Sequence, residues 1–225
     1  MANPPPTAWS PKRNRGKNRK AKTDYWGGGE DYKSRERESR GIIFDAIEKG
    51  NSFENIFIKD ACEKLFAGGD VPAEYSKEKN DEFRFPIYAN GLDKKGLYGY
   101  AKEPKVTEPA LTISARGTIG YCEARKEPFV PIVRLIVAIL KKDLFDLDFM
   151  KYFLDSLNII SNGSSIQQLT VPMISEIKIP HPPLETQRQI VEKLDKQMQA
   201  LEGVRLLKEE AQKRIEEILA GVWGE

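Results

Sequence analysis

The stretch "KIPHPPLETQRQIV", from Lys178 to Val191, decides the plan of the chain, because a short apolar run gives way to prolines and then to a helical pattern. Three prolines fall within the four residues from Pro180 to Pro183. A loop that served only as a flexible connection could be rich in Gly and Ser. Adjacent prolines instead hold an extended backbone and fix the direction in which the chain leaves the loop. We therefore interpret the stretch as a joint, with a defined angle, between a globular domain and a helix.

The segment after the prolines is predicted to form one long helix from Leu184 to Ala220. Its apolar residues recur in alternating steps of four and three, which is the rhythm of a coiled coil. The helix would run roughly 55 Å at 1.5 Å per residue, which is longer than a domain of this size can cover. Its apolar seam therefore needs a partner helix.

Two polar residues, Gln197 and Lys208, interrupt this seam and would restrict register and orientation more than they would add stability. The alternative, a helix lying on its own domain, is less favoured because the stripe is narrow and persists over several heptads. The predicted dimerisation residues are Ile190, Leu194, Leu201, Val204, Ala211, Ile215 and Ile218.

Residues 41–180 are predicted to form one α+β domain with irregular connections. Five short runs, each bounded by Gly, Pro, Asn or Asp, are typical of strands and turns. They are "FRFPIYA" (83–89), "GLYGYA" (96–101), "ALTIS" (110–114), "TIGYCEA" (118–124) and "PFVPIVRLIVAIL" (128–140). The stretch "LDFMKYFLDSLNII" (147–160) predicts an amphipathic helix, whereas "FENIFIKDACEKLF" (53–66) has helical or mixed spacing. The predicted fold class is therefore α+β: an irregular mixed β/α domain followed by one long coiled-coil-forming α-helix.

The first 40 residues combine prolines, a Gly27–Gly29 run and a basic block from Lys12 to Lys22 without an acidic residue. Almost nothing there could build a core, so we expect a disordered or loosely packed tail. The basic block could bind phosphates non-specifically, although a solvated tail is the more ordinary explanation. The predicted organisation is a tail over residues 1–40, a globular domain over 41–180, and the proline joint with its helix over 181–225.

The composition of the 225 residues, 40% hydrophobic and 31% charged with a net charge of +2, is that of an ordinary soluble globular protein. The longest apolar run, Phe129 to Leu140, is too short to span a bilayer and contains Pro131 and Arg134. No apolar segment of a secretory signal is found at the N-terminus, so we expect a cytoplasmic protein without membrane contact. Its two cysteines, Cys62 and Cys122, are expected to be buried reduced thiols, with a disulfide as the minority alternative.

The sequence offers little that could carry catalysis. The stretch "ANPPP" (2–6) is similar to the Asn-Pro-Pro-aromatic motif of amino-methylating DNA methyltransferases, but Pro6 stands in the aromatic position and no room exists upstream for their cofactor-binding half. His181 is the only histidine and has no second imidazole for a metal site. Glycine runs such as Gly27–Gly29 lack the strand and helix context of a phosphate loop. We therefore predict no catalytic residue, no metal site and no cofactor bound by this chain.

Two loop-rich stretches are better explained by binding. The first, "FPIYANGLDKKGLYGYAKEPK" (85–105), interleaves tyrosines and lysines around glycines, and the second, "TISARGTIGYCEARK" (112–126), ends a strand and presents polar side chains. Loops with Lys and Arg for phosphates, and with polar side chains for base edges, suit a DNA groove reader. Ordinary hairpins with solvated lysines explain the stretches about equally well. The predicted DNA contacts here are Tyr88, Asn90, Lys94, Lys95, Tyr98, Lys102, Ser114, Arg116 and Thr118.

Arg116 is the strongest single candidate among these residues. A guanidinium on a glycine-flanked turn can engage a phosphate or a guanine with two hydrogen bonds at once. The alternative is an Arg116 packed in the core and stacked on an aromatic ring.

The order of the motifs resembles one family. "PIYANG", "LTISARGTIGYC", a helix and then "SNGSSIQQLTVPMISEIKIPHPPLETQRQIVEKLD" are similar to the target-recognition domain and conserved helix of type I restriction–modification specificity subunits. The resemblance covers about residues 54–220, including the opening "IFIKDACEKLFAGG", and its most specific part is Pro-Pro-Leu-Glu-x-Gln-x-x-Ile-Val. It implies that residues 41–180 are the target-recognition domain and adds three predicted DNA contacts, Ser164, Ser165 and Gln167.

This resemblance also implies partners and a mechanism. Such a subunit is not an enzyme; it reads one half of a bipartite double-stranded DNA target and docks methyltransferase and restriction subunits, which use S-adenosylmethionine, Mg and ATP. Family members usually carry two recognition domains and two antiparallel helices, whereas this sequence has one of each. We therefore expect a half-subunit that forms a homodimer through antiparallel helices, or a truncated inactive remnant. A stand-alone DNA-binding protein and a coiled-coil interaction protein are the alternatives.

Overall fold

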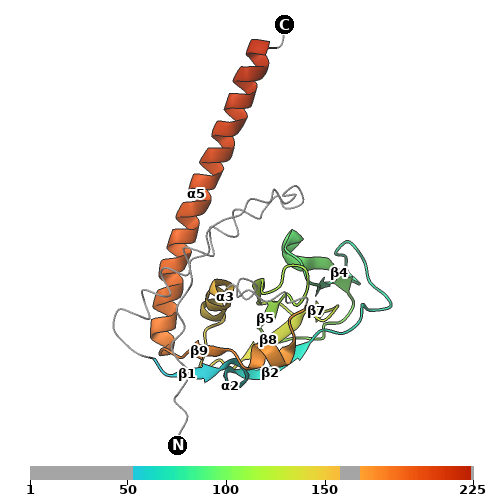
Figure 1. Cartoon of the computed structure of the whole chain (residues 1–225). Coiled ribbons are helices and arrows are strands. Elements are labelled where there is room, and N and C mark those ends of the chain that lie inside the picture. Colours follow the sequence, from blue (N-terminus) through green and yellow to red (C-terminus); the bar gives the residue numbers. More distant parts are fainter. Residues whose placement is uncertain (1–52, 158–167, 224–225) are drawn as a thin grey trace, which may run out of the picture.

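The computed structural model describes residues 53–157 and 168–223, which form a domain of three small sheets and one long helix (Figure 1). The predicted tail over 1–40, the start of the predicted domain at 41–52 and the stretch 158–167 lie outside the described residues. The division into three regions therefore stays a prediction. The α+β fold class with a long C-terminal helix is confirmed.

The central sheet has four antiparallel strands in the order β2–β8–β5–β6. Its strands are β2 (Cys62–Ala67), β8 (Ile136–Leu140), β5 (Ala110–Ile113) and β6 (Cys122–Arg125). Successive side chains of a strand point to opposite faces. In β8, Ile136 and Ala138 accordingly enter the main core, whereas Val137 and Ile139 enter a second cluster around Phe129. Both faces of this sheet are thus covered, which explains why the run "IVAIL" is apolar throughout.

Two smaller sheets flank the central one. Strands β4 (Leu97–Ala101), β3 (Phe85–Tyr88) and β7 (Val130–Pro131) form one of them. In the other, β1 (Asn55–Phe57) pairs antiparallel with β9 (Lys178–Pro180), so the two ends of the domain meet at the start of the long helix.

The sequence-based element boundaries need three corrections. The run "PFVPIVRLIVAIL" is two strands, β7 and β8, separated by a turn at Val133–Arg134. The helix predicted over 147–160 is shorter: α3 is Leu147–Ser156, and the Leu157 N–H closes its end on the Leu154 carbonyl (3.2 Å). The stretch 53–66, expected to have helical or mixed spacing, forms strand β1, the short helix α2 (Ile58–Ala61) and most of strand β2. A second short helix, α4 (Val171–Ser175), lies where turn and strand were expected.

Helix α3 covers one face of the central sheet. Its start is capped by Asp146, whose carboxylate accepts hydrogen bonds from the backbone N–H groups of Asp148 and Phe149, both at 3.0 Å. The largely buried Asp155 side chain joins α3 to β6, because it accepts a hydrogen bond from the Cys122 N–H (3.0 Å). It also accepts from Lys151 Nζ (2.9 Å), one turn earlier in α3. The bond to Cys122 helps to hold α3 on the sheet that carries the loops described below.

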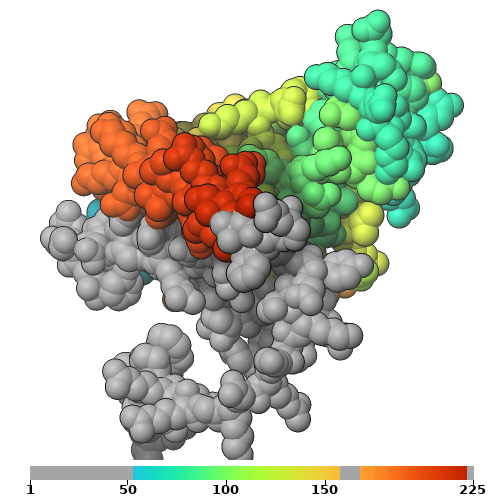
Figure 2. Space-filling model, turned by 90° about the horizontal axis from the view of Figure 1, so that it is seen from above, coloured from blue at the N-terminus to red at the C-terminus, as the bar shows by residue number. Residues whose placement is uncertain are grey.

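Helix α5 (Leu184–Trp223) begins on the domain and then projects far beyond it (Figure 1). Seen from above, it stands over one end of the domain, and the segment with β3 and β4 forms the other end (Figure 2). None of the helices in the described ranges combines the length and apolar content that crossing a bilayer requires.

The base of α5 is part of the domain's own core. Ile190 and Leu194 are buried in the same cluster as Phe149, with 5% and 1% of their surface exposed. Their assignment to the dimerisation seam is therefore wrong, and for this part of the helix the alternative of packing on its own domain is correct. Farther along, the side chains of Val204, Ile215 and Ile218 are more than half exposed (64%, 54% and 65%).

Gln187 locks the base of α5 to the domain. Its side chain is fully buried, and its Nε2 donates to the carbonyls of Leu144 and Pro182, both at 2.8 Å. Its Oε1 accepts from the Asp146 N–H at 2.8 Å. One side chain therefore ties the proline joint, the start of α3 and the first turns of α5 together.

Candidate nucleic-acid interface

Three loops of the domain meet at the side chain of Asn90. Its Nδ2 donates to the Val133 carbonyl and its Oδ1 accepts from the Ala115 N–H, both at 2.7 Å. The Gly91 N–H adds a bond to Ser114 Oγ (3.3 Å). These contacts join loops 89–96, 114–120 and 132–135, which together are termed the loop junction.

The 89–96 loop is held in an uncommon backbone conformation. Lys94 and Lys95 have φ values of 45° and 57°, in the left-handed region that glycine adopts most readily. Gly96, with φ 79°, closes the loop because its carbonyl accepts from the Ala89 N–H at 2.9 Å. A Cβ on Gly96 would lie 2.5 Å from the Ala89 carbonyl oxygen, so this position requires glycine. The two lysine side chains are exposed at the tip of the loop.

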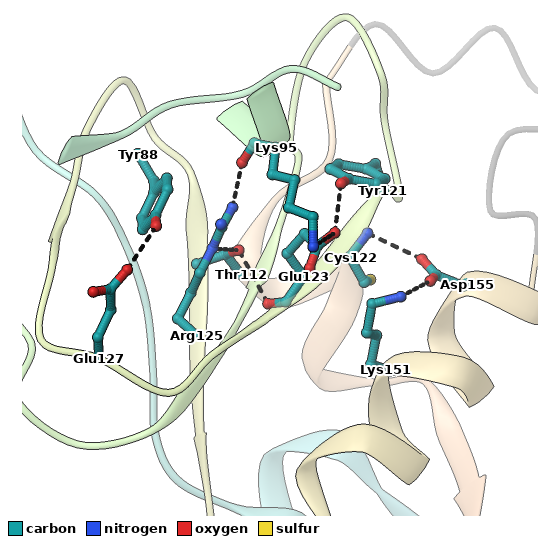
Figure 3. A network of polar contacts seen from close by, with 10 residues as sticks. All are labelled: Tyr88, Lys95, Thr112, Tyr121, Cys122, Glu123, Arg125, Glu127, Lys151 and Asp155. Carbon is teal, nitrogen blue, oxygen red and sulfur yellow. Dashed lines mark hydrogen bonds and ion pairs between the residues drawn. The ribbon is translucent and has the colours of Figure 1, made fainter. Parts of the chain in front are cut away.

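The buried Arg125 supports this loop from below (Figure 3). Its Nη2 donates to the Lys95 carbonyl (2.5 Å), its Nε donates to Thr112 Oγ1 (3.1 Å), and its guanidinium lies 3.5 Å from the centroid of the Tyr88 ring. Tyr88 in turn donates its hydroxyl to Glu127 Oε1 (3.3 Å). Burial lowers the pKa of Arg125 and raises that of Tyr88, because desolvation disfavours the charged form of each side chain.

The 114–120 turn presents Arg116. Its backbone is anchored on both sides, since the Leu169 N–H donates to the Ala115 carbonyl (2.8 Å) and the Gly120 N–H donates to the Ser114 carbonyl (2.9 Å). The Arg116 side chain is exposed, and its Nη2 donates to Gln168 Oε1 at 2.6 Å. The alternative of an arginine packed in the core is therefore wrong. Arg116 lies on a fixed turn with its guanidinium at the surface.

The 132–135 turn is strained. Val133 and Arg134 both have positive φ, 51° and 60°, although Gly, Asn and Asp are the usual residues of a β-turn with two positive φ values. For a side chain with a Cβ, this conformation costs about 1–2 kcal/mol per residue. The turn persists because neighbouring groups hold it, including the Leu135 N–H, which donates to the Ile132 carbonyl at 3.0 Å.

Residues 51–219 match the family model described as the type I restriction modification DNA specificity domain. The chain belongs to this family. The resemblance in the order of its motifs is thereby confirmed.

Relatives and solved structures agree with the family. The putative type I specificity subunits S.MpnORF507P and S.MpnORF89P of Mycoplasma pneumoniae are 32% and 36% identical over 147 and 144 residues, covering 65% and 63% of this chain but 40% and 43% of their own lengths. The HsdS subunit of Thermoanaerobacter tengcongensis has the same fold, with a TM-score of 0.59 and 19% identity over 80% of this chain and 47% of its own. A chain of a type I restriction–modification complex gives a TM-score of 0.66 at 19% identity, over 84% of this chain and 50% of its own. The chain thus spans half, or less, of the length of each of these four proteins.

Several predicted contacts of the specificity domain have internal roles instead. Tyr88 is 8% exposed and Ser114 is 1% exposed, and both polar groups of the Asn90 amide are used within the domain. The burial of Tyr88 and Ser114 contradicts their predicted direct contact with DNA, and both side chains position the loops instead. Asn90 is half-buried, and its amide keeps one N–H and one acceptor position beyond these two bonds, so its contact with DNA stays a prediction. Thr118 Oγ1 is also buried and lacks a hydrogen-bond partner among the residues described.

The remaining predicted contacts fall into two groups. Lys94, Lys95 and Arg116 lie exposed at the loop junction, with Lys95 Nζ 3.6 Å from Glu123 Oε1, and their contact with DNA stays a prediction. Tyr98 packs against Tyr75, with ring centroids 5.3 Å apart, and Lys102 bonds Glu74 (2.5 Å) and Glu82 (2.7 Å) at the far end of β4. These carboxylates raise the pKa of Lys102 and offset its charge. Ser164, Ser165 and Gln167 lie outside the described residues.

Sequence reasoning missed Arg125 and Arg134. In the sequence, Arg125 comes directly after the predicted strand 118–124, where a solvated cation is expected. It is instead the last residue of β6, and its burial follows only from the packing of this strand beside Tyr88. Arg134 interrupts an apolar run, which could have indicated a turn, but neither Val nor Arg is among the residues that favour turns. In the part of the chain that is described, no group of three or more His, Cys, Asp or Glu side chains is placed to hold a metal ion.

Proposed function

We propose that this chain is a DNA-specificity subunit of a type I restriction–modification system and that its loop junction reads one half of a bipartite target. The observation that carries the proposal is the presentation of Lys94, Lys95 and Arg116 on exposed loops whose backbones are held from inside. Cations serve phosphates, and a rigid arginine can read a guanine edge. Because the loops are already ordered, binding loses little of its free energy to fixing them.

The catalytic steps belong to partners in this proposal. The chain supplies recognition and docks a methyltransferase subunit and, in the full complex, a restriction subunit. Those subunits use S-adenosylmethionine, Mg and ATP. Membership in the specificity-domain family supports this division of labour.

The exposed part of α5 pairs with the same helix of a second copy in this proposal. Three of its apolar side chains, Val204, Ile215 and Ile218, are more than half exposed, and the described part of this chain does not bury them. An antiparallel pair can place Val204 opposite Ile215 of the second copy and Lys208 opposite its Ala211. The small alanine leaves room for the lysine stem, while the ammonium reaches water.

The test is to express the full chain with and without the methyltransferase subunit of its own system and to map methylated adenines across the host genome. We expect methylation at one interrupted sequence only when both proteins are present. DNA binding without methylation would instead indicate a stand-alone DNA-binding protein. The absence of duplex binding at low salt would indicate a coiled-coil interaction protein.

A further inference from the structure

Arg134 is exposed at the tip of the strained turn between β7 and β8, and it has no place in the predicted interface. Within the described ranges its guanidinium forms no hydrogen bond or ion pair. Its neighbour Val133 is 46% exposed, although valine is among the residues least suited to positive φ. A turn with two positive φ values that served only as a connection would be more stable with Asn-Gly, because these residues adopt positive φ at little cost. The strain therefore indicates that these side chains have a use at the surface.

Backbone hydrogen bonds to a neighbouring segment hold the turn in place. The Val133 N–H donates to the Gly69 carbonyl (2.8 Å), and the Arg134 N–H donates to the Gly68 carbonyl (3.1 Å). Gly68 permits this approach, because a Cβ there would lie 2.7 Å from the Pro131 carbonyl carbon and oxygen. The backbone of Arg134 is therefore fixed by hydrogen bonds. An arginine on a mobile loop would lack such a fixed starting point for its side chain.

The turn lies beside Arg116. One amide, that of Asn90, bonds both the Val133 carbonyl and the Ala115 N–H. The backbones of Val133 and Ala115 are therefore no farther apart than two hydrogen bonds and the width of an amide. Arg134 directly follows Val133, and Arg116 directly follows Ala115. The two arginines are therefore attached to neighbouring points of the loop junction.

We propose that Arg134 is a specificity-determining residue that contacts a base edge in the same half-site as Arg116. This inference rests on the proposed function. A phosphate could be reached by any flexible cation, whereas a guanine edge requires a guanidinium held at a defined position and angle. The methyl groups of Val133 suit contact with the methyl group of a neighbouring thymine.

The test compares Arg134→Gly with the unchanged chain, each in complex with its methyltransferase subunit. Glycine favours positive φ, so the thermal midpoint should stay equal or rise. The affinity for a duplex selected by the unchanged complex should nevertheless fall, by about 5- to 150-fold. Selection from a random duplex pool should then lose its preference at one or two positions. Lys142→Ala removes a charge at the opposite end of β8 and serves as the matched control, with affinity unchanged.

Each other outcome has a distinct meaning. If the unchanged complex selects no sequence, the proposed function itself fails. If Arg116→Ala loses affinity while Arg134→Gly and Arg134→Ala bind and select as the unchanged complex does, only the inference on Arg134 is overturned. Equal losses on all duplexes would make Arg134 a phosphate contact and also overturn it. A fall in thermal midpoint that accompanies the loss of affinity would assign the turn a structural role.

Discussion

Arg116 combines an exposed guanidinium with an anchored backbone. One hydrogen bond to Gln168 orients the side chain, and an arginine has five N–H donors in all. The same side chain can therefore be positioned from within the domain and still offer donors to a base or a phosphate. This combination distinguishes it from Lys102, whose charge is offset by Glu74 and Glu82.

Arg116→Ala should weaken binding of the complex to its target by about 1–3 kcal/mol, because a bidentate base contact is lost. The thermal midpoint should change little, since the side chain is exposed. Fluorescence anisotropy with target and unrelated duplexes measures both affinity and discrimination. Gln168→Ala, which removes the orienting bond but keeps the guanidinium, should have a smaller effect. Unchanged affinity and discrimination in Arg116→Ala would leave the residue without a role in recognition.

The two cysteines give a pH-dependent prediction. Burial raises the pKa of Cys62 to about 12 and that of Cys122 well above its ordinary value. Unfolded thiols ionise near pH 8.5, so the unfolded chain releases its protons first as the pH rises. Stability contributed by the buried neutral thiols is complete below about pH 8.5 and decreases above it, by about 1.4 kcal/mol per pH unit for each thiol.

Urea unfolding at pH 8 and pH 10 measures this effect. The free energy of unfolding should fall between the two pH values, and the fall should be about 2 kcal/mol smaller in Cys62→Ala than in the unchanged chain. The substitution also removes packed atoms, but that loss is the same at both pH values and cancels in the comparison. An identical fall in both proteins would mean that Cys62 ionises in the folded state.

The residues of the loop junction show what a sequence can and cannot predict. The stretches "PIYANG" and "SARG" are predicted from their residue types to belong to DNA-binding loops, and both contribute to the loop junction. Yet the side chains that suit a base edge are also the ones that suit internal hydrogen bonds. Only the three-dimensional placement shows that Asn90 and Ser114 are used inside, whereas Arg116 is exposed.

At the scale of elements, α5 is one helix with two environments. The coiled-coil rhythm correctly predicted its extent, but the same apolar spacing serves the domain core at Leu194 and the surface at Ile218. Spacing alone could not locate the change from one environment to the other. The short helices α2 and α4 were missed for a related reason, since helices of four or five residues are stabilised by their surroundings rather than by sequence pattern.

The two parts of α5 should respond differently to the same kind of truncation. Leu194→Ala removes core packing and should lower the free energy of unfolding by about 2–5 kcal/mol. Ile218→Ala should leave it within about 0.5 kcal/mol when the chain is monomeric, and should instead raise the dissociation constant for self-association. Urea unfolding at low protein concentration and sedimentation at higher concentration separate the two effects. Similar results for both variants would contradict the division of the helix.

At the scale of the whole molecule, symmetry leads to a prediction about the target. Two identical chains with antiparallel α5 helices are related by a twofold axis, so their recognition domains face opposite strands of the duplex. The methylated sequence should therefore be an inverted repeat interrupted by an unread spacer. Mapping of methylated adenines reports the sequence directly. Two different half-sites would contradict homodimeric recognition, and a stable monomer in sedimentation would contradict the helix pairing.

The three hydrogen bonds of Gln187 help to fix the angle at which α5 leaves the domain. Because α5 is about 60 Å long, a tilt of about 5° at its base would move its tip by about 5 Å, which is more than the ~3.4 Å rise of one DNA base pair. In the proposed homodimer, an error in this angle would therefore become an error in the distance between the two recognition domains. Loosening Gln187 in that dimer would make the distance between the two half-sites variable while leaving the reading of each one intact.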